Sequence, residues 1–168
     1  GLGWSKDEHE AVGASMTQRG ARADEFLAVM KAIWTKDPAA FRGTFYTLPR
    51  SVIETKPVQK PHPPIYMAAF VPAALKRIAR MADGWNPVGI PVDGMQKMFG
   101  GLKQMAKETG RDSSQLQLVV RANVEISSKA RPKDGAIFTG TVEQIKTDIE
   151  GCKRIGALEL HFDPTFMP

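Results

Sequence analysis

The sequence has little of several residue types on which common protein chemistries depend. Cys152 is the single cysteine among 168 residues, so no disulfide can form within the chain, and a reducing, cytoplasmic compartment is expected. No apolar run approaches the roughly 18 residues of a membrane span, and no signal peptide opens the chain, so we expect no membrane partner. Three histidines are too scattered to form a metal site by their spacing, and none is expected.

The chain also lacks the short motifs of several large enzyme classes. GxSxG, HExxH, CxxC, GxxxxGK[ST] and GxGxxG do not occur, which excludes the serine-hydrolase, zinc-protease, P-loop and simple dinucleotide-binding signatures. The net charge of +5 is a mild basic excess. Its densest stretch, Lys76 to Arg80, belongs to an expected amphipathic helix without interleaved aromatics. Nucleic acid is therefore not an expected partner.

The length and the 42% hydrophobic content favour one domain over residues 1–168, with enough apolar material for a core. Residues 49–64 are rich in proline, which excludes a helix and predicts an extended connector within that domain. The chain begins at Gly1 in the phrase GLGWSKDEHE, without an initiator methionine. This start looks like the middle of a longer sequence, and the chain could be a natural half gene or a fragment of a longer one.

Periodicity predicts alternating strands and helices after the connector. Phe26, Val29, Met30, Ile33 and Trp34 mark an earlier helix, and residues 41–49 suggest a short hairpin. The expected strands are 64–70, 83–90, 116–127 and 158–164, and the expected helices are 73–82, 93–109 and 141–155. Asp93 is the expected N-cap of the second of these helices, and Thr141 with Gln144 forms a capping box on the third.

Two architectures fit this α/β alternation, an open doubly wound sheet and a (β/α) barrel of the TIM type. The last two strands favour barrel units, because one face is apolar and the other polar, as barrel strands can be near a catalytic rim. The polar positions are Arg121, Asn123, Glu125, Glu159, His161 and Asp163. Four strands are half of the eight that a barrel needs.

Several of these positions could carry chemistry. The loop at 68–73 joins a strand end to a helix N-terminus, which suits a phosphate, although an ordinary turn fits equally. Thr141 heads another helix, but Gln144 already uses the donors there. His161 could donate a proton or be a hydrogen-bonded core residue. Arg121 could bind an anion or pair with Glu125 or Glu159.

Six segments carry a resemblance to a known family. They are GLGW, Arg22 with Glu25 before LAVMKAIW, FRGTFY, KPVQKPHPPIYMAA, ARMADGWNP and GTVEQIKTDIEGCKRIGALELHF. In this order and spacing, the chain resembles the C-terminal half of a bacterial luciferase-like monooxygenase. This is a (β/α)8 family of flavin- or deazaflavin F-420-dependent oxidoreductases.

The resemblance implies that the four predicted strands are the fifth to eighth of a barrel, with FMN or F-420 at their carboxyl ends. Its phosphate would lie at Ala68, Ala69, Phe70, Val71 and Ala73, where the family often has glycines. Gly3 and Trp4 would lie beside the ring system, and Asn86 at the rim. His161 would be the catalytic candidate, and Arg121 and Asp163 the substrate-binding candidates.

The implied reaction is hydride transfer between an alcohol or aldehyde and F-420, or monooxygenation by reduced FMN, on a small organic substrate. A homodimer in which two halves close one barrel is the expected partner arrangement. The alternative is a non-catalytic, oligomeric half-barrel that binds a small molecule or is vestigial.

Overall fold

The computed structural model describes residues 2–165, so Gly1 of the GLGW phrase lies outside them. The chain divides into two compact units, Gly1–Pro64 and Ile65–Pro168. This boundary coincides with the end of the predicted connector at 49–64, and residues 52–65 form neither helix nor strand. That residues 1–168 act as one half-barrel domain stays a prediction.

The first unit combines two helices with a hairpin. Its elements are α1 (Lys6–Ala11), α2 (Arg19–Thr35), β1 (Ala39–Arg42) and β2 (Thr47–Ser51). The strands β1 and β2 pair in antiparallel fashion, as the predicted hairpin requires. Helix α2 contains the whole predicted apolar stripe, but its buried residues are Leu27 and Ala32, whereas Phe26 of that stripe is exposed.

Glu25 holds the hairpin turn to α2, which explains two of the segments behind the family resemblance. Its carboxylate accepts hydrogen bonds from the backbone N–H groups of Thr44, Phe45 and Tyr46 at 2.8, 2.8 and 3.1 Å. Burial alone would raise the Glu25 pKa, but these three bonds outweigh it and lower the pKa. A Cβ on Gly43 would lie 2.3 Å from Oε2 of Glu25, so a side chain there would displace the carboxylate that holds the turn.

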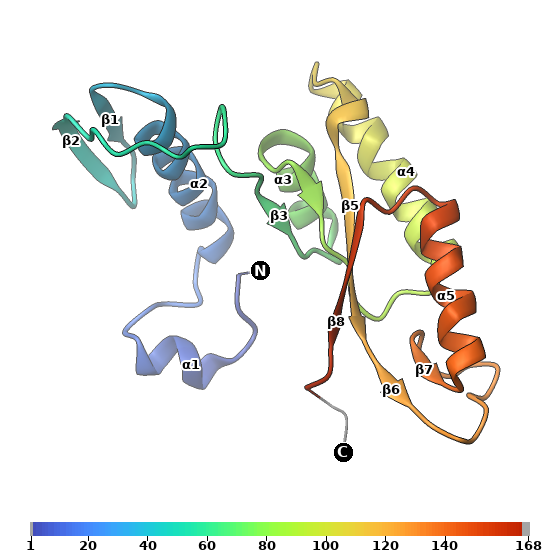
Figure 1. Ribbon diagram of the computed structural model, residues 1–168. Coiled ribbons are helices and arrows are strands. Elements are labelled where there is room, and N and C mark those ends of the chain that lie inside the picture. The colour runs from blue at the N-terminus through green and yellow to red at the C-terminus, as the bar shows by residue number, and fades with distance from the viewer. Residues whose placement is uncertain (1, 166–168) are drawn as a thin grey trace. The chain divides into compact units, whose positions relative to one another are not determined.

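The second unit is a parallel α/β arrangement (Figure 1). Its elements are β3 (Tyr66–Met67), α3 (Pro72–Met81), β4 (Gly84–Trp85), α4 (Val92–Glu108), η1 (Ser113–Gln115), β5 (Gln117–Asn123), β6 (Glu125–Ile126), β7 (Thr139–Gly140), α5 (Val142–Arg154) and β8 (Glu159–Asp163). The main sheet has the order β3-β4-β5-β8, and β6 and β7 form a separate parallel pair.

The strand order favours one of the two predicted architectures. Strands follow one another across the sheet in chain order, and right-handed crossovers then place every connecting helix on the same face. A doubly wound sheet needs a reversal of that order, which this sheet does not have. Figure 1 shows α4 and α5 side by side along β5 and β8. The unit is therefore wound in one direction, as barrels are, although no closed barrel forms among residues 2–165.

The core of the second unit lies between the sheet and these helices. Its most deeply buried side chains include Ile78, Trp85, Met95, Leu102, Leu118 and Val120. Met95 thus fills part of this core. Among the described helices, none combines the length and the apolar character needed to cross a membrane.

Four details of the predicted pattern are wrong. Helix α4 begins at Val92 with Pro91 as its N-cap, because the extended backbone of Pro91 starts the turn, so Asp93 lies within the first turn. The helical spacing of Val142, Ile145, Ile149 and Cys152 predicts one buried face on α5, but Val142 in the first turn is exposed. The predicted capping box of Thr141 and Gln144 is confirmed. Ile126 is exposed because it lies on the short β6 strand beyond the main sheet.

The fourth wrong detail concerns β8, where the alternation of apolar and polar residues predicted one buried apolar face. Leu158 and Phe162 are 62% and 57% exposed. The reason is position, since β8 is an edge strand with a neighbour on one side.

Candidate functional site

The predicted site residues of the second unit gather at the carboxyl ends of the four parallel strands, an edge that we call the rim. It consists of the loop 68–73 after β3, Asn86 after β4, residues 121–123 of β5 and residues 161–163 of β8. The register places Arg121 opposite His161 and Asn123 opposite Asp163. Because residues in register share a face of a parallel sheet, these four side chains are neighbours on one side.

Arg121 forms an ion pair with Asp163 at the rim, between its Nη2 and the Oδ2 of Asp163. The sequence suggested Glu125 or Glu159 as partner, and both suggestions are wrong. The cause is strand register, which brings the end of β8 beside the end of β5. The Arg121 side chain remains 40% exposed, so the pair leaves guanidinium surface open for a further contact.

Asp163 is held as a carboxylate. Its Oδ1 accepts hydrogen bonds from the backbone N–H of Thr165 at 2.9 Å and from the Thr165 hydroxyl. These bonds, followed by Arg121, lower the pKa of Asp163 from 3.8 to about 2, although desolvation opposes them. Asp163 is therefore ionised under ordinary conditions and cannot serve as a general acid there.

The lowered pKa predicts an acid-dependent loss of stability. Because the folded-state pKa of Asp163 lies below the value of 3.8 expected when unfolded, its contribution is present above pH 3.8 and disappears as the pH falls through about 2. Asp163→Asn should flatten this part of the curve when urea midpoints are measured from pH 5 to pH 2. An identical slope in the variant and the wild type would contradict the assignment.

The loop after β3 presents an uncapped helix end. Val71 is the N-cap of α3, its side chain makes no capping bond, and Pro72 follows in the first turn. Phe70 and Val71 are both more than half exposed, whereas Ala69 is buried and its carbonyl accepts a 3.0 Å hydrogen bond from Nε1 of Trp85. The loop is thus fixed at Ala69 and open at the start of α3.

Asn86 and His161 complete the predicted rim residues of this unit. The Asn86 backbone N–H bonds to the carbonyl of Met67 at 2.9 Å, and its Nδ2 bonds to the carbonyl of Val119 at 2.7 Å. Asn86 therefore joins three strands, and one of its side-chain donors is already committed. His161 is exposed.

Gly3 and Trp4 belong to the first unit. Gly3 has a φ of +77°, and its carbonyl accepts a 2.9 Å hydrogen bond from Arg19. The Trp4 side chain is 87% exposed. An exposed indole of this kind is free to stack on a ligand.

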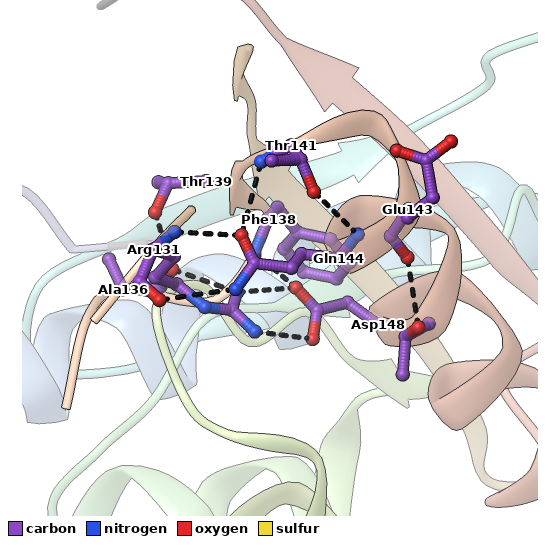
Figure 2. A network of polar contacts seen from close by, with 9 residues as sticks. Arg131, Ala136, Phe138, Thr139, Thr141, Glu143, Gln144 and Asp148 are labelled. Atoms are coloured by element: carbon purple, nitrogen blue, oxygen red, sulfur yellow. Dashed lines mark hydrogen bonds and ion pairs between the residues drawn. The ribbon is translucent and has the colours of Figure 1, made fainter. Parts of the chain in front are cut away.

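A network of buried polar groups, which sequence reasoning missed, anchors the loop between β6 and β7 (Figure 2). Asp148 of α5 accepts two hydrogen bonds from the Arg131 guanidinium, at 2.5 and 3.1 Å, and one from the Phe138 N–H at 2.8 Å. Phe138 needs this support because its φ is +65°, a strained value for a bulky residue. Asp148 lies on the helical stripe of Ile145 and Cys152, a signal that predicts a buried carboxylate.

The Gln144 side chain fixes the same loop by bonding to the loop's backbone. Its Oε1 accepts from the N–H groups of Arg131 and Thr141, and its Nε2 donates to the Arg131 carbonyl (Figure 2). Gln144 therefore has two roles: it caps α5, as predicted, and it holds the backbone of Arg131. Thr141 and Gln144 use their polar groups on each other and on Arg131, as expected for a structural helix start.

Two further chemistries can be assessed from side-chain placement. Cys152 is a buried free thiol, and its pKa is raised to about 11, first by burial and then by Asp148, which makes it a poor nucleophile. Within residues 2–165, no three side chains of His, Cys, Asp or Glu are grouped so that they could hold a metal ion.

Comparison with known proteins finds a matching family model and similar monooxygenases. The model of the luciferase-like monooxygenase family matches residues 1–131. FMNH(2)-dependent dimethylsulfone monooxygenase of Pseudomonas putida is 32% identical over 111 residues, which cover 64% of this chain and 31% of that protein. The chain spans about a third of the length of the curated relatives that it matches.

Solved structures show the same fold at low sequence identity. A monooxygenase from Streptomyces bottropensis superposes with a TM-score of 0.73 at 20% identity, covering 96% of this chain and 59% of the other. The coenzyme F-420-dependent tetrahydromethanopterin reductase of Methanopyrus kandleri gives 0.78 at 12% identity, covering 98% and 67%. Fold similarity therefore extends over almost all of the chain.

Proposed function

Because the chain belongs to the luciferase-like monooxygenase family, we propose that its rim is the cofactor side of a flavin- or F-420-dependent oxidoreductase. The observation that carries the proposal is that an uncapped helix start and a charged pair both lie at carboxyl ends of strands in one parallel sheet. Relatives described as FMNH(2)-dependent and as F-420-dependent support the same two cofactors.

The phosphate of either cofactor would be bound at the start of α3. Phosphate needs hydrogen-bond donors and a positive potential, and a helix N-terminus without a capping side chain supplies both. Val71 and Phe70 leave this position open to solvent, although Ala68 and Ala69 leave less room than glycines would. Ala73, in the first turn, would contribute its backbone N–H.

The other rim residues would bind and orient the reacting groups. The bound cofactor would accept a hydride from an alcohol or donate one to an aldehyde, or, as reduced flavin, would supply the means to activate dioxygen. Arg121, fixed by ionised Asp163, would offer its open N–H groups to an oxygen of a small organic substrate. His161 would hold or move a proton beside it. Asn86 would contact the cofactor.

Activity requires that the sheet be completed. The described sheet has four parallel strands with free edges at β3 and β8, where a barrel has eight closed strands. We propose that the chain corresponds to the second half of such a barrel. Further βα units, from a longer polypeptide or from a second copy of this chain, would pair with these edges.

Val71→Asp tests the phosphate position and separates folding from binding. Aspartate is a better N-cap than valine and should stabilise α3 by about 0.5–2 kcal/mol. The same negative charge should weaken FMN binding by about tenfold or more through repulsion of the phosphate. Equilibrium dialysis measures FMN, riboflavin and F-420 affinity, and urea denaturation measures stability.

The controls identify the cause of any change. Val71→Ser caps the helix without a charge, so it competes for the same backbone donors but adds no repulsion and should weaken FMN binding less than Val71→Asp does. Riboflavin lacks the phosphate, so Val71→Asp should leave its affinity unchanged. Equal FMN binding by Val71→Asp and Val71→Ser contradicts a phosphate site at α3, and a wild-type chain that binds none of the three ligands contradicts the proposed function.

A further inference from the structure

Asn123 carries an unsatisfied hydrogen-bond acceptor at the rim. Its Oδ1 is buried and, among residues 2–165, has no hydrogen-bond partner. A buried acceptor without a donor is rare in folded proteins and costs free energy. Such an atom therefore calls for a donor that the protein itself does not provide.

The neighbours of Asn123 show why none of them supplies that donor. Asn123 ends β5 opposite Asp163, and Arg121 lies two residues earlier on the same face. The Arg121 guanidinium bonds to Oδ2 of Asp163, and Thr165 donates both of its bonds to Oδ1 of that carboxylate. Nη2 of Arg121 and both donors of Thr165 are thus committed to Asp163, and no residue among 2–165 donates to Oδ1 of Asn123.

The same surroundings define the chemistry of the missing group. Oδ1 of Asn123 lies at the strand end that also carries the carboxylate of Asp163, so a phosphate or carboxylate oxygen would be repelled there. A neutral N–H or O–H group would be accepted. The ring systems of flavins and deazaflavins both carry an imide N–H, which is complementary to an amide oxygen.

We propose that Asn123 is a cofactor-binding residue whose Oδ1 accepts a hydrogen bond from the ring N–H of the flavin or deazaflavin. This inference rests on the proposed function and adds a residue that recognises the ring, whereas the start of α3 recognises the phosphate. The unsatisfied oxygen then lowers the stability of the unliganded protein, and ligand binding removes this free-energy cost.

Asn123→Leu tests the inference with two readouts. Leucine has a similar shape and no polar atom, so the unliganded variant should have a urea midpoint equal to or higher than that of the wild type. Its affinity for riboflavin, FMN and F-420 should each fall about tenfold, because all three ligands carry the ring N–H.

Gln117→Leu is the matched control on the same strand. Oε1 of Gln117 accepts a 2.5 Å hydrogen bond from the Tyr66 hydroxyl, so this substitution breaks a satisfied bond at the opposite end of β5. It should lower the urea midpoint and leave riboflavin and FMN affinity unchanged. The two leucine variants therefore have opposite expected signatures.

Two results overturn the assignment of Asn123 while leaving the proposed function intact. One is wild-type affinity for riboflavin and FMN in Asn123→Leu. The other is a loss of unliganded stability as large as that of Gln117→Leu, which means that Oδ1 already has a partner. A wild-type chain that binds no riboflavin, FMN or F-420 removes the proposed function, and the assignment of Asn123 fails with it.

Discussion

Replacing Asp148 with alanine is expected to destabilise the second unit by about 3–5 kcal/mol, the usual cost of removing one partner from a buried ion pair. Asp148 is 8% exposed and accepts hydrogen bonds from Arg131 and from the backbone of Phe138. Its loss leaves a guanidinium without its counter-charge and a strained loop residue without its acceptor. Urea denaturation followed by circular dichroism measures the change.

Matched variants distinguish the charge from the backbone bond. Asp148→Asn keeps one acceptor for Phe138 and should fall between wild type and alanine. Arg131→Met combined with Asp148→Leu removes both charges and should recover part of the loss. Glu150→Ala changes an exposed carboxylate on the same helix and should alter stability by less than about 0.5 kcal/mol. An Asp148→Ala effect no larger than that of Glu150→Ala contradicts the role of the network.

Gly84→Ala is the second substitution with a large expected effect, on the order of 3 kcal/mol. A Cβ at Gly84 would lie 2.5 Å from the backbone oxygen of Gln117 and 2.8 Å from Cδ1 of Tyr66. A backbone atom cannot rotate away as a side chain can, so β4 and β5 must separate. Because these strands form the middle of the sheet, the loss should appear in global unfolding.

Gly101→Ala is the control for the glycine substitution. Gly101 lies within α4, and a Cβ there meets no atom within 4 Å. Alanine should therefore stabilise the protein by about 0.5–1 kcal/mol through helix propensity. The two glycine-to-alanine substitutions should therefore change the urea midpoint in opposite directions. A midpoint that rises in Gly84→Ala contradicts the packing described for β4.

Local patterns predicted the helices and the buried central strands because their signals lie within a few turns of chain. The predicted helices at 73–82 and 141–155 and the capping box at Thr141 are examples, and the structure confirms them as α3, α5 and the start of α5. Exposure of Leu158 and Phe162 could not be predicted in this way. Alternation shows which side chains share a face, but the strand's position at a sheet edge depends on segments far along the chain.

The sequence predicted where the rim residues lie, but it did not predict which of them pair with each other. Strand ends predicted where Arg121, His161 and Asp163 gather, because carboxyl ends of parallel strands share an edge. The pairing of Arg121 with Asp163 joins residues 42 positions apart and depends on register, which periodicity does not specify. Asn123 was recognised as polar, but its lack of a partner emerges only when its neighbours' bonds are known.

The measurement that tests the central claim most directly is a two-dimensional 15N–1H NMR titration of the chain with FMN. Amide shifts should change at 69–71, 73, 86, 121–124 and 161–163, and riboflavin should reproduce all of them except those at the start of α3. Shifts confined to the pocket of about 230 Å³ beside Val92, Lys133 and Asp148, or no shifts at saturating FMN, would contradict a cofactor site at the rim.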